Sequence, residues 1–119
     1  MPPSTQLRIG VIGCSGRGTI ARHWHDPHGR SVVVAGADTN AKNLAAFPGV
    51  IGSDKLTLVS DYRALLDRKD IDAIAVCSPD WLHEEQATAA LEAGKHVFCE
   101  KPLAITIEGC DRILHAQER

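Results

Sequence analysis

A glycine-rich segment near the start of the chain combines residue types that could bind a phosphate group. It extends from Gly13 to Gly18, contains Gly16, and follows the apolar run Leu7–Ile12. If this run is a strand and a helix comes next, the segment lies where backbone amides and the positive end of a helix would meet a dinucleotide pyrophosphate. Ser15 occupies the middle glycine position of the G-x-G-x-x-G pattern, so an ordinary glycine-rich turn stays open as the alternative.

A carboxylate follows the second apolar run, Ser31–Ala37, at the expected carboxyl end of a strand. There Asp38 can accept hydrogen bonds from both adenosine ribose hydroxyls and would repel a 2′-phosphate, so we predict NAD in preference to NADP. Lys42 and Arg17 lie close enough in sequence to keep NADP as the alternative. Asp38 and Thr39 precede a helical stretch, so capping of that helix is a second interpretation.

A third group of polar residues follows the apolar run Ile71–Cys77 and should reach the same edge of the sheet. It consists of Ser78, Pro79, Asp80 and His83. Because proline has no N–H, we expect a neighbouring backbone carbonyl to be free for a ligand. His83 could contact a nicotinamide or a substrate, or it could pack as a structural histidine on the inner face of a helix.

The segment Glu100, Lys101, Pro102 follows the last expected strand, Lys95–Cys99. A lysine ammonium here could donate a hydrogen bond to a reacting oxygen and stabilise negative charge during hydride transfer. Glu100 would position or neutralise this ammonium. A solvated charge pair followed by a proline turn is the alternative.

Short apolar runs alternate with stretches of helical spacing throughout residues 1–119. This alternation predicts one doubly wound α/β domain, a Rossmann fold with a parallel sheet and right-handed crossovers. The expected strands are Leu7–Ile12, Ser31–Ala37, Leu56–Val59, Ile71–Cys77 and Lys95–Cys99. The expected helices are Gly16 to about His25, Asn40–Phe47, Ser60 or Asp61 to about Arg68, about Asp80 to Ala93, and a last one from about Thr106.

The composition argues against several classes of protein. The net charge of −2 gives no basic excess, so we expect no nucleic-acid partner. The apolar runs are too short for a signal peptide or a membrane span, which predicts a cytoplasmic protein with no membrane partner. The histidines His23, His25 and His28 have no carboxylate cluster beside them, so we expect no metal. The four cysteines contain no CxxC pair and are expected to be mostly buried thiols.

Several motifs together resemble the N-terminal domain of the Gfo/Idh/MocA oxidoreductases, the relatives of glucose–fructose oxidoreductase and inositol dehydrogenase. The similarity covers nearly the whole chain, and its last part, residues 90–97 running into Glu100-Lys101-Pro102-Leu103, is highly specific. The matching segments are residues 8–14, Ser60-Asp61-Tyr62 with Leu65-Leu66, Ile71-Asp72-Ala73, residues 78–83, residues 90–97 and Glu100-Lys101-Pro102-Leu103.

The resemblance implies a role for each matching residue. Gly13, Gly16 and Gly18 would line the pyrophosphate, Asp38 the adenosine ribose, Ser78 with Pro79 the nicotinamide, and Lys101 would be the catalytic residue. Ser15 departs from the usual glycine, and because serine is small we expect binding to survive. The implied activity is hydride transfer between a nicotinamide cofactor and a sugar, polyol or related hydroxyl compound.

Two other functions stay open for relatives of this kind: an NAD-dependent glycosidase and a non-enzymatic nucleotide sensor. The family usually continues into a sixth strand and a substrate domain, so we expect this chain to be a truncated form that does not turn over alone. Family members often form homo-oligomers, which makes a homo-oligomer an option here as well.

Overall fold

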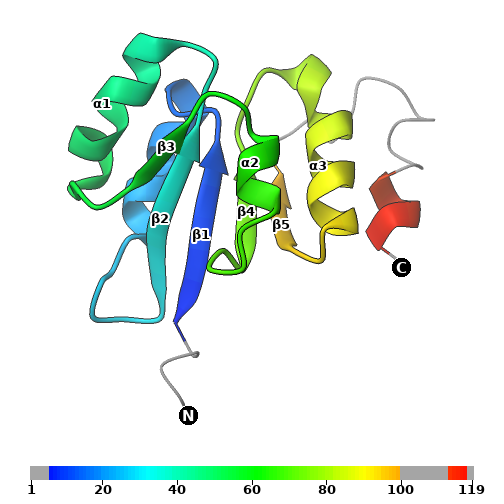
Figure 1. The fold of residues 1–119 in the computed structure, drawn as a ribbon, viewed down its shortest axis with the longest axis horizontal. Helices are drawn as coiled ribbons and strands as arrows, with labels where there is room; N and C mark the ends of the chain where they lie inside the picture. Colours follow the sequence, from blue (N-terminus) through cyan, green and yellow to red (C-terminus); the bar gives the residue numbers. More distant parts are fainter. Residues whose placement is uncertain (1–5, 100–112, 118–119) are drawn as a thin grey trace.

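The computed structural model describes residues 6–99 and 113–117, and it confirms the predicted doubly wound α/β fold. A five-stranded sheet has the order β3-β2-β1-β4-β5, with every neighbouring pair parallel. The chain therefore reverses its direction of winding between β1 and β4, at the centre of the sheet (Figure 1). The strands are β1 (Leu7–Ile12), β2 (Ser31–Ala37), β3 (Thr57–Val59), β4 (Ala73–Val76) and β5 (His96–Cys99).

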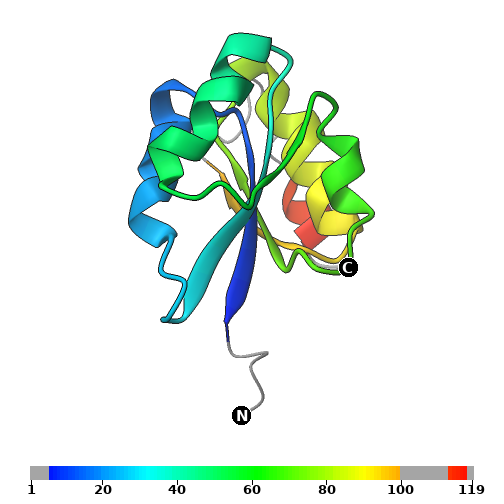
Figure 2. The ribbon, with the colours of Figure 1, turned by 60° about the vertical axis from the view of Figure 1, so that its left-hand side comes forward.

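Helical segments cover both faces of this sheet, as a parallel sheet requires. Figure 2 shows the sheet between two layers, with η2 and α1 on one side and α2 and α3 on the other. The bounds are η2 (Gly16–Trp24), a 3-10 helix, α1 (Ala41–Ile51), α2 (Arg63–Leu66), the short 3-10 helix η3 (Asp80–Leu82) and α3 (His83–Glu92).

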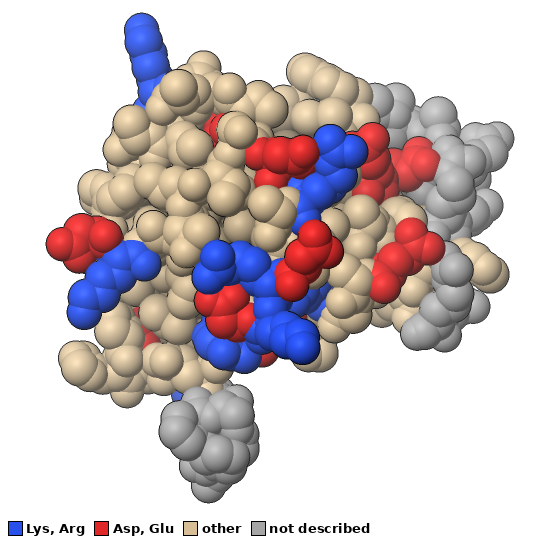
Figure 3. Space-filling model, viewed as in Figure 1, with Lys and Arg blue, Asp and Glu red and all other residues tan. Residues whose placement is uncertain are grey.

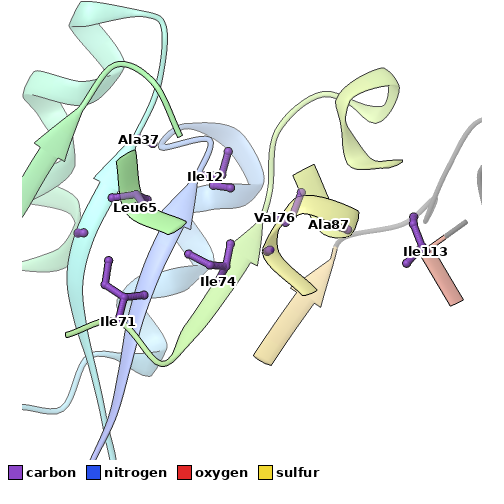
Figure 4. Close-up of a cluster of buried hydrophobic side chains, with 10 residues drawn as sticks. Ile12, Ala37, Leu65, Ile71, Ile74, Val76, Ala87 and Ile113 are labelled. Atoms are coloured by element: carbon purple, nitrogen blue, oxygen red, sulfur yellow. The ribbon is translucent and has the colours of Figure 1, made fainter. Parts of the chain in front are cut away.

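Side chains alternate between the two faces and form a core on each. Under α2 and α3 the core includes Leu65, Ile74 and Val76, all of them fully buried (Figure 4). Under η2 and α1 it includes Val11 and Phe47, which are also fully buried. This continuous burial explains why the strands read as unbroken apolar runs in the sequence.

The predicted helix Asn40–Phe47 was too short, because α1 continues through Pro48 to Ile51. Phe47 and Ile51 are both buried and lie one turn apart, so packing on the sheet offsets the N–H that proline lacks. The Pro48 carbonyl then accepts hydrogen bonds from the Gly52 and Ser53 amides, at 2.8 and 3.1 Å, which ends the helix.

Other predicted elements differ mainly at their ends. The helix expected from Ser60 or Asp61 is the short α2, which begins where the Asp61 carboxylate accepts the Arg63 amide at 3.0 Å. The helix expected from Asp80 is divided into η3 and α3, because the Leu82 amide turns back to the Pro79 carbonyl at 3.0 Å. The strands β3, β4 and β5 are shorter than predicted, while β1 and β2 match their predicted bounds.

Polar side chains tie the strands together at the amino edge of the sheet. Asp72 accepts hydrogen bonds from the backbone amide, Nε and Nη2 of Arg8, at 2.9, 3.0 and 3.0 Å. The Lys95 ammonium donates to the carbonyls of Arg68 and Ile71, both at 2.6 Å. These bonds hold the segments before β4 and β5 at the edge opposite the carboxyl ends of the strands.

The molecular surface in Figure 3 carries acidic and basic side chains side by side, without a broad patch of one sign on the face shown. Exposed ion pairs join Arg63 to Asp61 and Arg68 to Asp70. Within the described residues, no helix is both long and apolar enough to cross a membrane. Of the predicted last helix, residues 113–117 are described and helical, with Ile113 buried in the core under α3.

Candidate functional site

A crevice of about 560 Å³ opens at the carboxyl edge of the sheet, beside the point where the winding reverses. Ligands of open α/β sheets bind at this position, and the volume lies within the range of about 300–1,000 Å³ for small-molecule sites. Below, "the crevice" means the space lined by Ile12, Gly13, Ser15, Gly16, Ala37, Asp38, Thr39, Asn43, Ser60, Tyr62, Cys77, Ser78, Pro79, Trp81, Leu82 and Gln86.

The glycine-rich loop between β1 and η2 forms one wall of the crevice. A Cβ atom on Gly18 would lie 1.8 Å from the Gly13 carbonyl oxygen, so only glycine permits the tight path of this loop. Gly16 has a positive φ of +54°, and a Cβ atom there would meet nothing within 4 Å. The Gly16 backbone is therefore open to the crevice, which lies at the amino end of η2, where a helix has amides without partners in the helix.

Asp38 follows β2 and connects the loop to α1. Its Oδ2 accepts a hydrogen bond from the Cys14 amide at 3.0 Å, and its Oδ1 accepts one from the Asn40 amide at 2.8 Å. Asn40, rather than Asp38 or Thr39, is the N-cap of α1, because its Oδ1 accepts the amides of Lys42 and Asn43. The interpretation of Asp38 or Thr39 as the cap of this helix was therefore wrong, because Asp38 binds the backbone amide of Asn40, which is itself the N-cap.

The thiol of Cys14 is buried beneath the loop. Burial, with the nearby Asp38 carboxylate as a second cause, raises the pKa of Cys14 to about 12. The thiol is therefore protonated at neutral pH, and its Sγ lies 3.5 Å from the Ala37 carbonyl oxygen. Cys14 thus packs the loop on the core and offers no nucleophile to the crevice.

The segment after β4 forms the opposite wall. Ser78 and Pro79 both line the crevice, and the Ser78 hydroxyl donates to Oε1 of Gln86, a buried side chain of α3. The carbonyl predicted to be free beside Pro79 is engaged, because the Ser78 carbonyl lies 2.7 Å from Nε2 of His83. The Pro79 carbonyl accepts the Leu82 amide at 3.0 Å.

His83 lies behind this wall and does not line the crevice. Only 1% of it is exposed, and its ring nitrogen contacts the carbonyl of Ser78. A direct contact between His83 and a ligand in the crevice therefore has no support in the geometry. The structure instead favours the packed structural histidine, which supports Ser78 from beneath.

Two aromatic side chains, Tyr62 and Trp81, also line the crevice. The Tyr62 hydroxyl donates a hydrogen bond of 2.9 Å to Glu85 Oε2, which links the start of α2 to α3. Burial, followed by this hydrogen bond with Glu85, raises the pKa of Tyr62 to about 12. Trp81, on η3, is 68% exposed although it is a large apolar side chain, so it is available for contact with a ligand or another part of a protein.

The structure brings seven of the predicted site residues to one crevice, and the others divide into three groups. Gly18 and His83 lie behind its walls. The backbones of Arg17 and Asp80 lie in η2 and η3, but their side chains are outside the description. Glu100, Lys101 and Pro102 lie outside the described residues altogether. The residues that line the crevice are Gly13, Ser15, Gly16, Asp38, Thr39, Ser78 and Pro79.

Sequence reasoning did not assign the crevice residues Asn43 and Gln86 to the site. Both are polar residues of amphipathic helices, where a polar side chain usually faces solvent. Their position in the first turns of the helices that follow β2 and β4 is the signal that could have identified them. Among the described residues, no group of three or more His, Cys, Asp or Glu side chains is arranged to hold a metal ion.

The fold and the crevice define the class of protein: a doubly wound α/β domain with a glycine-rich loop beside its switch point and an acidic residue after the neighbouring strand β2, the arrangement that binds dinucleotides. Residues 7–119 match the family model of Gfo/Idh/MocA proteins, described as the oxidoreductase family with an NAD-binding Rossmann fold. The chain belongs to this family, which confirms the resemblance inferred from its motifs.

Individual relatives agree with the family assignment. The chain is 44% identical over 116 residues to an inositol 2-dehydrogenase of Klebsiella pneumoniae subsp. pneumoniae, covering 93% of this chain and 33% of the relative. The chain thus spans about a third of the length of the curated relatives it matches.

Solved structures of longer proteins contain the same domain. KijD10, a 3-ketoreductase from Actinomadura kijaniata in complex with NADP, superposes with a TM-score of 0.80 at 32% identity over 95% of this chain and 36% of that protein. The WlbA dehydrogenase from Bordetella pertussis, in complex with NADH and UDP-GlcNAcA, gives a TM-score of 0.78 at 30% identity over 95% and 34%. Structures similar to this chain therefore hold either form of the nicotinamide cofactor.

Proposed function

We propose that residues 1–119 form the dinucleotide-binding domain of an oxidoreductase that transfers hydride between a nicotinamide cofactor and the hydroxyl-bearing carbon of a sugar, polyol or related hydroxyl compound. One observation carries the proposal: the glycine-rich loop, Asp38 and Ser78 converge on a single crevice in a chain of this oxidoreductase family. An inositol 2-dehydrogenase and a dehydrogenase solved in complex with UDP-GlcNAcA are among the similar proteins and support the substrate class.

The residues of the crevice fit a dinucleotide. The Gly13, Cys14 and Gly18 amides are engaged by Ala37, Asp38 and Ser15, so we expect the pyrophosphate to bind at the other amides of the loop, at positions 15 to 17. The open space at Gly16 lets a phosphate approach the backbone. Ser15 is exposed and lines the crevice without capping η2, so its hydroxyl is available as a further donor.

NAD is the preferred cofactor in this proposal. Asp38 lies at the carboxyl end of β2, where the adenosine ribose of a dinucleotide binds in this class of fold. Its carboxylate would accept a ribose hydroxyl and repel a 2′-phosphate. Both NADP and NADH occur among the similar structures, so this preference needs its own measurement.

Catalysis is assigned to Lys101, which follows β5 in sequence. The bound nicotinamide supplies or accepts the hydride. The Lys101 ammonium would donate a hydrogen bond to the substrate oxygen and exchange a proton with it as the carbonyl and hydroxyl forms interconvert. Ser78 and Pro79 would hold the nicotinamide side of the crevice.

Titration of the chain with NADH and NADPH, followed by nicotinamide fluorescence and calorimetry, tests the cofactor proposal. We expect saturable binding of NADH and weaker binding of NADPH. Absence of saturation by either cofactor at millimolar concentration would reject the proposed site. Turnover is tested in the complete gene product, where Lys101→Met should lower kcat by about 100-fold or more while NADH binding is retained.

A further inference from the structure

The carboxylate of Asp38 already accepts three hydrogen bonds from the protein itself. Its Oδ2 accepts from the Cys14 amide at 3.0 Å and from Asn43 Nδ2 at 3.4 Å, while its Oδ1 accepts from the Asn40 amide at 2.8 Å. A carboxylate has about four acceptor positions. Three are engaged, so one position on Oδ1 is left, and Asp38 has room for one ribose hydroxyl rather than two.

Asn43 is the nearest side chain that could take the second hydroxyl. It is half-buried, lines the crevice, and contacts Asp38 through a hydrogen bond that is long at 3.4 Å. A carboxamide both donates and accepts, so it can bind a hydroxyl in either role. Its bond to Asp38 uses one N–H of the carboxamide, so the second N–H and the Oδ1 of Asn43 stay available to the ligand.

Helix capping does not require the side chain of Asn43. Asn40 is the N-cap of α1, and Asn43 occupies the third helical position, whose side chain in a capping box binds the N-cap amide. Here the Asn40 amide is bound by Asp38 instead, and the Lys42 and Asn43 amides are bound by Asn40 Oδ1. The Asn43 carboxamide is thus directed to the crevice rather than to the end of its own helix.

We propose that Asn43 is the second ribose ligand of the crevice, so that Asp38 Oδ1 binds one hydroxyl of the adenosine ribose and the Asn43 carboxamide binds the other. This inference rests on the proposed function, because it assigns a residue to the same dinucleotide site. The two residues would then contribute differently to the recognition of the ribose. The charge of Asp38 disfavours a 2′-phosphate, whereas the neutral Asn43 recognises the position of a ribose hydroxyl.

The test compares the wild-type chain with Asn43→Ala in calorimetric titrations with ADP-ribose and with its 2′-deoxy and 3′-deoxy adenosine analogues. For ADP-ribose, we expect Asn43→Ala to weaken binding about fivefold, the size of one neutral hydrogen bond. One deoxy analogue should bind both proteins equally, because it lacks the hydroxyl that Asn43 contacts. The other analogue should bind Asn43→Ala about fivefold more weakly than wild type, as ADP-ribose does.

Lys55→Ala, an exposed change outside the crevice, serves as the matched control, and the melting temperature of each variant shows that it is folded. Equal losses for both analogues, or no loss for ADP-ribose, would overturn the role of Asn43 while wild-type binding leaves the proposed function intact. Failure of the folded wild-type chain to bind ADP-ribose would overturn both.

Discussion

The carboxylate of Asp38 holds the backbone of the glycine-rich loop, because its Oδ2 accepts a hydrogen bond of 3.0 Å from the Cys14 amide. The two residues follow neighbouring strands, Asp38 after β2 and Cys14 after β1. The same carboxylate lines the crevice, so the shape of the loop and the recognition of the ribose depend on one side chain. Loss of this side chain should affect stability and binding together.

For Asp38→Ala we expect the free energy of unfolding to fall by about 2 kcal/mol, since hydrogen bonds to a charged acceptor are lost and the loop amide loses its partner. NADH affinity should fall at least about tenfold, because the ribose acceptor is lost with it. Urea denaturation and a fluorescence titration measure the two effects. Asp54→Ala, at an exposed position, is the control. Unchanged NADH binding by Asp38→Ala would contradict the ribose role.

Two alanine substitutions in the loop separate folding from binding. Gly18→Ala places a Cβ atom 1.8 Å from the Gly13 carbonyl oxygen, so we expect a destabilisation of about 3 kcal/mol. Gly16→Ala meets no neighbouring atom and carries only the cost of a positive φ, about 1 kcal/mol. Its methyl group would occupy the open space where we expect the pyrophosphate to approach the backbone. NADH affinity should therefore fall about tenfold in a chain that is still folded. Thermal unfolding and NADH titration distinguish the two outcomes, and equal stability of the variants would contradict the close approach.

Cys14 should resist alkylation in the folded chain. With its pKa raised to about 12 by burial, the Cys14 thiol is almost entirely protonated at pH 8. Treatment with iodoacetamide, followed by digestion and mass spectrometry, should label Cys14 far more slowly in the folded chain than in urea. Cys99, which is only partly buried, is the internal comparison. Equal labelling of Cys14 in both states would contradict the burial of this thiol.

Stability should decrease in acid partly through Asp72. The hydrogen bond from the Arg8 side chain lowers the pKa of Asp72 below its ordinary value. The carboxylate therefore stabilises the folded chain fully above the unfolded-state pKa of about 3.9, and this stabilisation is lost as the pH falls through the lower folded-state value. Urea denaturation of the wild type and Asp72→Asn should show a difference at about pH 7 that narrows below about pH 4. A difference independent of pH would contradict this account.

The convergence of the loop, Asp38 and Ser78 could be predicted from the sequence, because the carboxyl ends of parallel strands meet at one edge of the sheet. The different hydrogen-bonding roles of Asp38 and Asn40 could not be predicted from the sequence. Both residue types are good helix caps, and only the backbone path decides which one binds which amide. The sequence also left His83 ambiguous. Its helical spacing with Ala87 indicates an inner face, and only coordinates distinguish packing against Ser78 from contact with a ligand.

The extension of α1 past Pro48 shows where local rules fail. Proline usually marks the end of a helix because it lacks an N–H, and that rule placed the end at Phe47. The burial of both Phe47 and Ile51 against the sheet is a long-range effect that a local reading of Pro48 and Gly49 does not contain. Tertiary packing therefore determined the length of this helix.

Lys95 should contribute to stability through an unusual pair of acceptors. Its ammonium donates to the carbonyls of Arg68 and Ile71, both at 2.6 Å, and so connects the start of β5 with the segment before β4. Lys95→Met keeps the length of the side chain but removes the donors, and we expect it to lower the free energy of unfolding by about 2 kcal/mol. The exposed Lys69→Met, changed in the same way on the same edge, should be close to neutral. Urea denaturation measures both variants, and equal stability of Lys95→Met and wild type would show that solvent replaces these bonds without cost.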